Sequence, residues 1–116
     1  MARSAIINVM VQAAMKAGRS LSRDFGEVQN LQVSLKGPGD YVSQADRRAE
    51  EIIFTELAKA RPSYSFLMEE RGEVAGDDDQ HRFIVDPLDG TTNFLHGIPM
   101  FSVSIALERQ GQLAAA

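Results

Sequence analysis

Two stretches of the chain carry apolar residues at intervals of three and four, which is the spacing of one face of an α-helix. In residues 4–25 the opposite face is polar and charged, so the pattern predicts an amphipathic helix. A second helix is predicted to open with the capping pattern Ser43-Gln44-Ala45-Asp46 and to end at Arg61-Pro62, because the residue before a proline disfavours the helical conformation. The apolar positions are Ile6, Val9, Met10, Ala13, Ala17, Leu21 and Phe25 in the first helix, and Ala49, Ile52, Ile53, Leu57 and Ala60 in the second.

Shorter apolar runs predict strands. Residues 31–35 alternate between apolar and polar positions before a turn at 37–40, and residues 64–68 form a second candidate. Residues 83–85 predict a buried strand that stops at the carboxylate of Asp86, whereas residues 72–80 predict a polar, acidic loop. Residues 101–107 alternate again, and residues 113–116 begin a return strand; we expect the apolar face of the 101–107 strand to lack a cover. This succession predicts an α/β fold with layered helices and sheet.

Composition narrows the class of protein. The chain is 44% hydrophobic and 24% charged, with a net charge of −4, which is typical of a soluble globular protein. Its basic residues are scattered, so we expect no nucleic-acid partner. The absence of cysteine excludes disulfides and thiolate chemistry and fits a cytoplasmic protein. Polar Asn8 and Gln12 interrupt the apolar N-terminal segment, which predicts a helix face rather than a signal peptide, and we expect no membrane span.

Carboxylates follow two of the predicted strands. Glu69 and Glu70 come directly after one strand, and Asp86 and Asp89 flank the end of another. Oxygen ligands at the carboxyl ends of strands suit a hard cation such as Mg²⁺, and the amides of residues 90–92 at a helix start suit a phosphate. Together they favour metal-assisted phosphoryl chemistry. The simpler alternative is that Asp86 and Asp89 are a turn residue and a helix cap.

The run Asp86-Pro87-Leu88-Asp89-Gly90-Thr91-Thr92-Asn93-Phe94 resembles the signature of the inositol monophosphatase family of Mg²⁺-dependent, lithium-sensitive phosphatases. Glu69-Glu70 and the segment from Lys36 to Asp46 occur in the order that the family requires, and the resemblance is closest to its bacterial inositol monophosphatase and extragenic-suppressor group. The resemblance implies an αβαβα sandwich of the sugar-phosphatase type. Residues 1–116 would be the N-terminal metal- and phosphate-binding part of one phosphatase domain more than twice as long, whose C-terminal half supplies a further carboxylate ligand.

The same resemblance implies roles for particular residues. Glu69, Asp86 and the backbone carbonyl of Leu88 would hold one Mg²⁺, and Asp86 and Asp89 a second. Thr91 and Asp46 would position the attacking water, with Glu69 also holding waters. The amides of Gly90 and Thr91, with Lys36 nearby, would bind the substrate phosphate. The implied activity is hydrolysis of a small phosphomonoester, most simply a myo-inositol phosphate, by a cytoplasmic homodimer.

Several of these residues also fit other structural or functional roles. Asp46 lies three residues after Ser43, a spacing that helix capping alone explains. The Asp-x-Asp-Gly-Thr motif of aspartate-nucleophile phosphatases is superficially similar, but two residues separate Asp86 from Asp89, which fits metal ligation better. The substrate could be another polyol phosphate or a nucleotide 3′-phosphate. A function of a different class is also possible from the sequence, in which the chain is a phosphatase-like module that binds a partner protein without catalysis.

Overall fold

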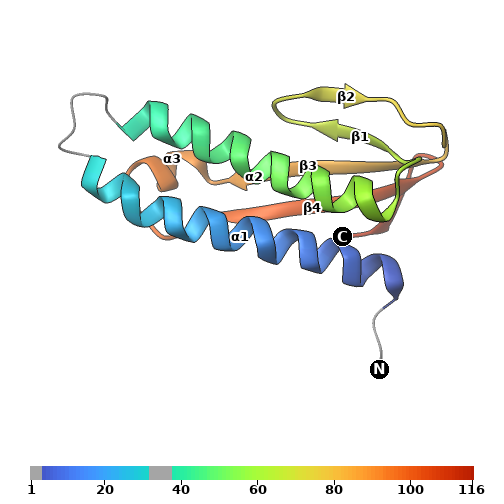
Figure 1. Ribbon diagram of the computed structural model, residues 1–116, viewed down its shortest axis with the longest axis horizontal. Coiled ribbons are helices and arrows are strands. Elements are labelled where there is room, and N and C mark those ends of the chain that lie inside the picture. The colour runs from blue at the N-terminus through green and yellow to red at the C-terminus, as the bar shows by residue number, and fades with distance from the viewer. Residues whose placement is uncertain (1–3, 32–37) are drawn as a thin grey trace.

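Two long helices form one layer of the fold. The computed structural model describes residues 4–31 and 38–116, with side chains described for residues 4–27 and 42–116. Helices α1 (Ala5–Leu31) and α2 (Pro38–Ala60) run side by side across the molecule (Figure 1). Their facing stripes include four alanines that are fully buried, Ala13, Ala17, Ala45 and Ala49. Small side chains let the two backbones approach closely, which buries the larger apolar residues of both stripes against the sheet.

A five-stranded sheet forms the second layer, in the order β2-β1-β3-β4-β5. Its strands are β1 (Ser65–Met68), β2 (Gly72–Val74), β3 (His81–Asp89), β4 (Ser102–Arg109) and β5 (Gln112–Ala115), and the short helix α3 (Thr91–Leu95) links β3 to β4. Strands β1 and β3 are parallel, and the other pairs are antiparallel. Register aligns Phe66, Phe83 and Leu107 in one row and Met68, Val85 and Ile105 in the next, all buried. Both helices pack on this face, which confirms a layered α/β fold.

Several predicted elements agree with the structure. The second helix ends at Ala60, one residue before Arg61-Pro62, and the strands predicted at 64–68, 101–107 and 113–116 correspond to β1, β4 and β5. The loop predicted at 72–80 contains the short edge strand β2. The prediction that nothing covers the apolar face of the 101–107 strand is wrong, because Ile105 and Leu107 are buried in the core shared with α1.

The boundaries of two helices and one strand also differ from the predictions. Helix α1 continues to Leu31, so the first residue of the strand predicted at 31–35 is helical, while residues 32–35 lie outside the described part of the chain. Helix α2 begins at Pro38, which places Ser43 and Asp46 inside the helix rather than at its cap. Strand β3 passes through Asp86 to Asp89, with an irregular register between these two residues. Tertiary pairing with β4 therefore extends a strand that the sequence predicted to stop at Asp86.

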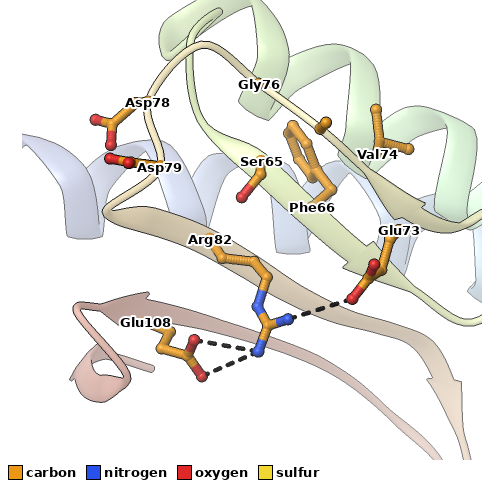
Figure 2. A pocket seen from close by; sticks show the side chains of 10 residues that line it. Ser65, Phe66, Glu73, Val74, Gly76, Asp78, Asp79, Arg82 and Glu108 are labelled. Carbon is orange, nitrogen blue, oxygen red and sulfur yellow. Dashed lines mark hydrogen bonds and ion pairs between the residues drawn. The ribbon is translucent and has the colours of Figure 1, made fainter.

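The other face of the sheet carries charged groups. Figure 2 shows Arg82 on β3 between Glu108 and Glu73, with N–O distances of 3.1 Å and 3.7 Å. These residues border a hollow of about 420 Å³ at the end of the sheet where β1 and β3 begin. Among the described residues, both long helices lie on the opposite face. The hollow is therefore remote from the carboxylates that follow β1 and β3.

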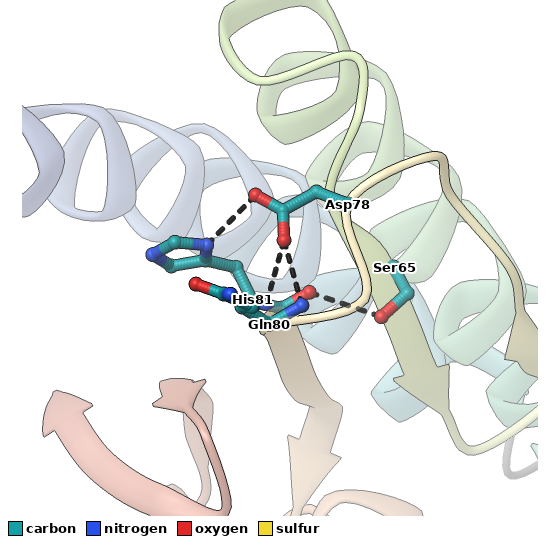
Figure 3. Close-up of polar contacts among 4 residues, drawn as sticks. All are labelled: Ser65, Asp78, Gln80 and His81. Carbon is teal, nitrogen blue, oxygen red and sulfur yellow. Dashed lines mark hydrogen bonds and ion pairs between the residues drawn. The ribbon is translucent and has the colours of Figure 1, made fainter.

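A polar turn fixes the start of β3 (Figure 3). The Asp78 carboxylate accepts hydrogen bonds from the backbone amides of Gln80 (2.7 Å) and His81 (3.2 Å), and it contacts the His81 ring at 2.8 Å. The Gln80 amide is the largest cause that lowers the pKa of Asp78. The Ser65 hydroxyl of β1 donates to the carbonyl of His81 (3.0 Å). These contacts lock β1 and β3 in register, and that register decides what meets at their other ends.

Candidate active site

Acidic side chains from three elements converge at the carboxyl ends of β1 and β3. The parallel register pairs Met68 with Val85, so Glu69, which follows β1, lies beside Asp86 of β3. Helix α2 packs against β3 and adds Asp46, whose carboxyl group is close enough to feel the charges of both Glu69 and Asp86. The structure thus brings together three residues that the sequence separates by up to 40 positions.

The Glu69 carboxyl group lies within reach of a hydrogen bond to the Asp86 carboxyl group. This bond is the largest cause that raises the pKa of Glu69 to about 7, followed by burial and the nearby charges of Asp46, Asp86 and Glu70. Two carboxyl groups can share a hydrogen bond only when one of them carries a proton. Acidic groups crowded together in this way favour a bound cation, which would offset their charge.

Asp46 is a buried acidic residue. Its side chain is 6% exposed, and its Oδ1 atom has no hydrogen-bond partner among the described residues. Burial is the largest cause that raises the pKa of Asp46 to about 6, and the charges of Glu70, Asp86 and Glu50 add to it, while Arg47 opposes it. A buried carboxylate without a partner is costly in folding free energy. Such a group is typical of a site that is completed by a ligand.

The turn after Asp86 is tightly packed. Pro87 and Leu88 are fully buried. The Leu88 amide donates to Oδ1 of Asp86 (3.3 Å), and the Thr91 hydroxyl donates to the Leu88 carbonyl (3.1 Å). The turn thereby holds the Asp86 carboxylate, the Leu88 carbonyl and the Thr91 hydroxyl close together in one short segment. Asp89 is exposed at the end of β3, beside this turn.

Gly90 is required by the backbone at the start of α3. Its φ is 91°, a left-handed conformation that other residues rarely adopt, and a Cβ at this position would lie 2.8 Å from the Met100 carbonyl oxygen. The Asn93 side-chain amide donates to the same carbonyl (2.9 Å). Asp89, Gly90 and Asn93 border a hollow of about 430 Å³.

An aromatic cluster anchors α3 to the body of the fold. Phe94 is fully buried, and its ring lies 5.5 Å from that of Phe25 on α1 and 4.8 Å from that of Phe101, with centroids as the reference points. Edge-to-face pairs at these distances are favourable. The cluster therefore holds the segment from Asp86 to Phe94 against α1, and the position of the site depends on the helix layer.

The donor set fits a hard divalent cation. The described residues contain no cluster of three or more His, Asp and Glu side chains already arranged to hold a metal ion. The oxygen atoms available are nevertheless those of Glu69, Asp86, Asp89 and the Leu88 carbonyl, and Asp46 adds an unpartnered buried oxygen. Oxygen ligands of this kind match Mg²⁺ rather than zinc. Lys36, predicted to contribute positive charge, lies outside the described residues.

One functional candidate escaped the sequence analysis. Glu50 on α2 is 2% exposed, and its two carboxylate oxygens accept hydrogen bonds from the backbone amides of Glu70 and Arg71. A signal was present, because Glu50 lies next to Ala49 and three residues before Ile53 on the buried stripe of the helix. An acid on such a stripe needs hydrogen-bond partners.

Comparisons with known proteins agree with this fold. A family model described as the inositol monophosphatase family matches residues 2–116. An inositol-1-monophosphatase from Mesorhizobium japonicum is 85% identical over 99% of this chain and 43% of that protein. The Nus factor SuhB of Escherichia coli is 37% identical over 96% of the chain and 42% of that protein. The crystal structure of the extragenic suppressor protein SuhB from Bartonella henselae superposes with a TM-score of 0.84 and 78% identity, over 96% of this chain and 43% of that one.

The fold and the site define a layered α/β protein with a carboxylate cluster where parallel strands end. The family match covers nearly the whole chain, and the chain belongs to the inositol monophosphatase family. It spans less than half the length of the curated relatives it matches. Among the described residues, no helix is both long and apolar enough to cross a membrane.

Proposed function

We propose that the full-length protein containing this chain is a Mg²⁺-dependent phosphomonoester hydrolase that acts on myo-inositol phosphates. The observation that carries the proposal is the convergence of Asp46, Glu69 and Asp86 at one end of the sheet, where burial and neighbouring acidic groups raise the pKa values of Asp46 and Glu69. The chain's likeness to an inositol-1-monophosphatase over 99% of its length supports this choice of substrate.

In this proposal, Glu69, Asp86 and the Leu88 carbonyl hold one Mg²⁺, and Asp86 and Asp89 hold a second. When bound, Mg²⁺ supplies positive charge that offsets the charge of the phosphate and makes water a stronger nucleophile. The C-terminal part of the longer protein adds a further carboxylate. The raised pKa of Glu69 means that cation binding at this site releases a proton near neutral pH.

Asp46 and Thr91 position the attacking water and take up its proton. The pKa of Asp46, raised to about 6, makes its carboxylate a better proton acceptor than an ordinary aspartate. The Thr91 hydroxyl, which donates to the Leu88 carbonyl at 3.1 Å, has its oxygen free to accept a hydrogen bond from water. The amides of Gly90 and Thr91 receive the phosphate, and Lys36 adds positive charge.

Further properties belong to the same proposal. Lithium inhibits by occupying the site bounded by Asp86 and Asp89 without stabilising the leaving oxygen. The protein works as a cytoplasmic homodimer, and its partner molecules are small phosphomonoesters rather than nucleic acid or membrane. The ring of the substrate is recognised mainly by residues of the C-terminal part, so other polyol phosphates and nucleotide 3′-phosphates belong in the substrate panel.

The test is a phosphate-release assay on the full-length protein with inositol monophosphate. We expect turnover with Mg²⁺ in the ordinary range for enzymes, of the order of 1 per second or more, and loss of turnover in EDTA that added Mg²⁺ restores. Millimolar lithium should inhibit the Mg²⁺-dependent rate. Turnover that persists undiminished in EDTA would contradict the proposal.

A second candidate function rests on the relative named Nus factor SuhB, which is 37% identical to this chain. That name favours a role as a binding partner in a larger assembly, with catalysis absent or incidental. A full-length protein that binds Mg²⁺ but releases phosphate from no member of the substrate panel would favour this function over hydrolysis.

A further inference from the structure

The turn between β1 and β2 carries Glu69 at an exposed edge of the sheet. Strand β2 has only three residues, and within the described part of the chain it pairs with β1 alone and lies at the end of the strand order. The turn residues Glu69, Glu70 and Arg71 are all exposed. Edge hairpins of this length have little intrinsic stability. The direction in which Glu69 points therefore depends on contacts that the turn makes outside the sheet.

Helix α2 supplies these contacts from one stripe. Residues Arg47, Glu50, Glu51 and Phe54 lie three, four and seven positions apart, so they share one face of the helix. Each of them contacts the turn through Glu70 or Arg71. We call these four residues the α2 stripe. It joins the turn to the helix that also carries Asp46.

Glu50 is the buried member of the α2 stripe. Its side chain is the only one of the four that the core encloses, and its oxygens accept the amides of Glu70 at 2.9 Å and Arg71 at 3.2 Å. A carboxylate that accepts backbone amides makes stronger hydrogen bonds than a neutral acceptor. Because the two amides belong to the residues directly after Glu69, their fixation sets the backbone from which the Glu69 side chain projects.

The remaining contacts of the stripe are peripheral. Arg71 pairs with Glu51 and lies over the ring of Phe54, with 4.3 Å between its guanidinium carbon and the ring centroid. Arg47 and Glu70 approach only to 4.0 Å, and the Arg47 side chain is mostly exposed. Exposed ion pairs of this kind contribute little to stability. They provide matched comparisons for Glu50, because Glu51 has the same charge and contacts the same turn.

We propose that Glu50 is a positioning residue that orients Glu69 for metal binding through the amides of Glu70 and Arg71. The proposal rests on the proposed function, because it takes Glu69 as a metal ligand. Glu50 lies one helical turn after Asp46, so a single rigid helix sets both the buried carboxylate and the ligand-bearing turn. Residues that orient metal ligands typically change metal affinity by about 10- to 100-fold when they are replaced.

The experiment compares Glu50→Gln and Glu50→Ala with the control Glu51→Gln in the full-length protein. Hydrogen exchange of the amides of residues 70 and 71 is measured without metal, and Mn²⁺ affinity is measured by calorimetry. The rate of phosphate release is then measured as a function of Mg²⁺ concentration. Glu69→Gln serves as the reference for loss of the ligand itself.

In both Glu50 variants we expect the amides of residues 70 and 71 to exchange hydrogen at least about 10-fold faster than in the wild type, while the β1 amides keep their protection. Mn²⁺ affinity should fall by about 10- to 100-fold, and the Mg²⁺ concentration for half-maximal rate should rise in parallel, with kcat at saturating Mg²⁺ changed far less. Glu51→Gln should change Mn²⁺ affinity by less than about threefold. If Glu50→Ala does not fold, Glu50→Gln, which keeps the shape and one acceptor oxygen, decides the question.

Three outcomes would contradict the proposal, and they can be told apart. Normal Mn²⁺ affinity in the Glu50 variants, alongside a defect in Glu69→Gln, would overturn the role of Glu50 and leave the proposed function intact. Normal Mn²⁺ affinity in Glu69→Gln would show that Glu69 is not a ligand, and would overturn the metal assignment together with the positioning role. A loss of affinity in Glu51→Gln equal to that in Glu50→Gln would also contradict the proposal, because general charge would then explain it.

Discussion

Met68 on β1 lies directly opposite Val85 on β3 in a parallel register, and this pairing places Glu69 beside Asp86. The side chains of Met68 and Val85 are both buried in the core beneath the helices. A shift of one residue in the register would turn a buried side chain toward the other face of the sheet. Packing of the apolar core therefore fixes the β1–β3 register, and with it the position of Glu69 relative to Asp86.

Asp89 is expected to be essential although it is exposed at the end of β3. Replacing Asp89 with Asn keeps the shape but removes a negative charge from the second proposed metal site. Phosphate release from inositol monophosphate should fall at least about 100-fold, equivalent to about 3 kcal/mol of transition-state stabilisation. The comparison variant is Asp79→Asn, which removes an exposed aspartate at the other end of the sheet and should retain nearly full activity.

Asp46 should make the metal-free protein less stable as the pH rises. Its pKa is about 6 in the folded protein against an ordinary value of 3.8, so the folded state holds the proton more tightly than the unfolded state. The stabilising effect of the protonated group is complete below about pH 4 and is lost as the pH rises to about 6. At pH 7 in EDTA, Asp46→Asn should therefore raise the free energy of unfolding by about 1–3 kcal/mol.

Urea unfolding at pH 4 and pH 7 tests this prediction on the full-length protein. The difference between Asp46→Asn and wild type should shrink toward zero at pH 4, where both side chains are neutral. The same substitution should strongly lower activity with Mg²⁺, because it removes the proposed proton acceptor. A variant that is equally destabilised at both pH values would contradict the electrostatic explanation.

Gly90 offers a test of the turn that precedes α3. In Gly90→Ala the new methyl group would meet the Met100 carbonyl at 2.8 Å and the residue would keep a φ of 91°, so clash and strain add together. We expect a loss of about 2–4 kcal/mol in the free energy of unfolding, measured by urea titration, and loss of most of the phosphatase activity. Gly72→Ala is the matched control, because Gly72 has a φ of 71° but no atom within 4 Å of the added carbon. It should cost only the strain, about 1 kcal/mol.

Sequence patterns predicted the parts of the fold that depend on local periodicity. The stripe from Ala49 to Leu57 buries Ala49, Ile53 and Leu57, and the alternation in β4 buries Ile105 and Leu107, as their spacing predicts. The start of α2 was predicted five residues late, since the Ser43–Asp46 spacing resembles a cap although tertiary structure extends the helix to Pro38. Asp46 thereby changes from a surface cap to a buried group. The role of Glu50 required knowledge of which turn faces α2, and this long-range pairing has no local signal in the sequence.

The site, like the fold, has features that depend on local sequence and features that depend on long-range pairing. The segment from Asp86 to Phe94 could be identified from its order of residues, because proline, glycine and threonine each have a local structural reason to stand there. The proximity of Glu69 to Asp86 depends instead on the β1–β3 register. The metal and phosphate roles of these residues stay predictions that the variants above are designed to test.

The final prediction is that residues 1–116, expressed alone, associate with one another and release no phosphate. Helix α1 covers one face of β4, but the opposite face of the sheet has no helix on it among the described residues, and it includes the half-exposed Leu67, Ile84 and Ala106. Strand β5 is the last in the sheet order, and its Leu113 is 72% exposed. An unpaired strand edge beside apolar surface is a template for association.

The relatives are more than twice as long as this chain, so residues beyond the present 116 are expected to cover that surface and to complete the second metal site. With only Asp86 and Asp89 as carboxylates, that site would hold Mg²⁺ too weakly for catalysis. Size-exclusion chromatography with light scattering, followed by a phosphate assay at saturating Mg²⁺, tests both parts. Association should weaken when Leu113 is replaced by Lys, because a charged edge resists pairing. A soluble monomer of residues 1–116 with turnover near 1 per second, within the ordinary range for enzymes, would instead demonstrate that the site is complete within this chain.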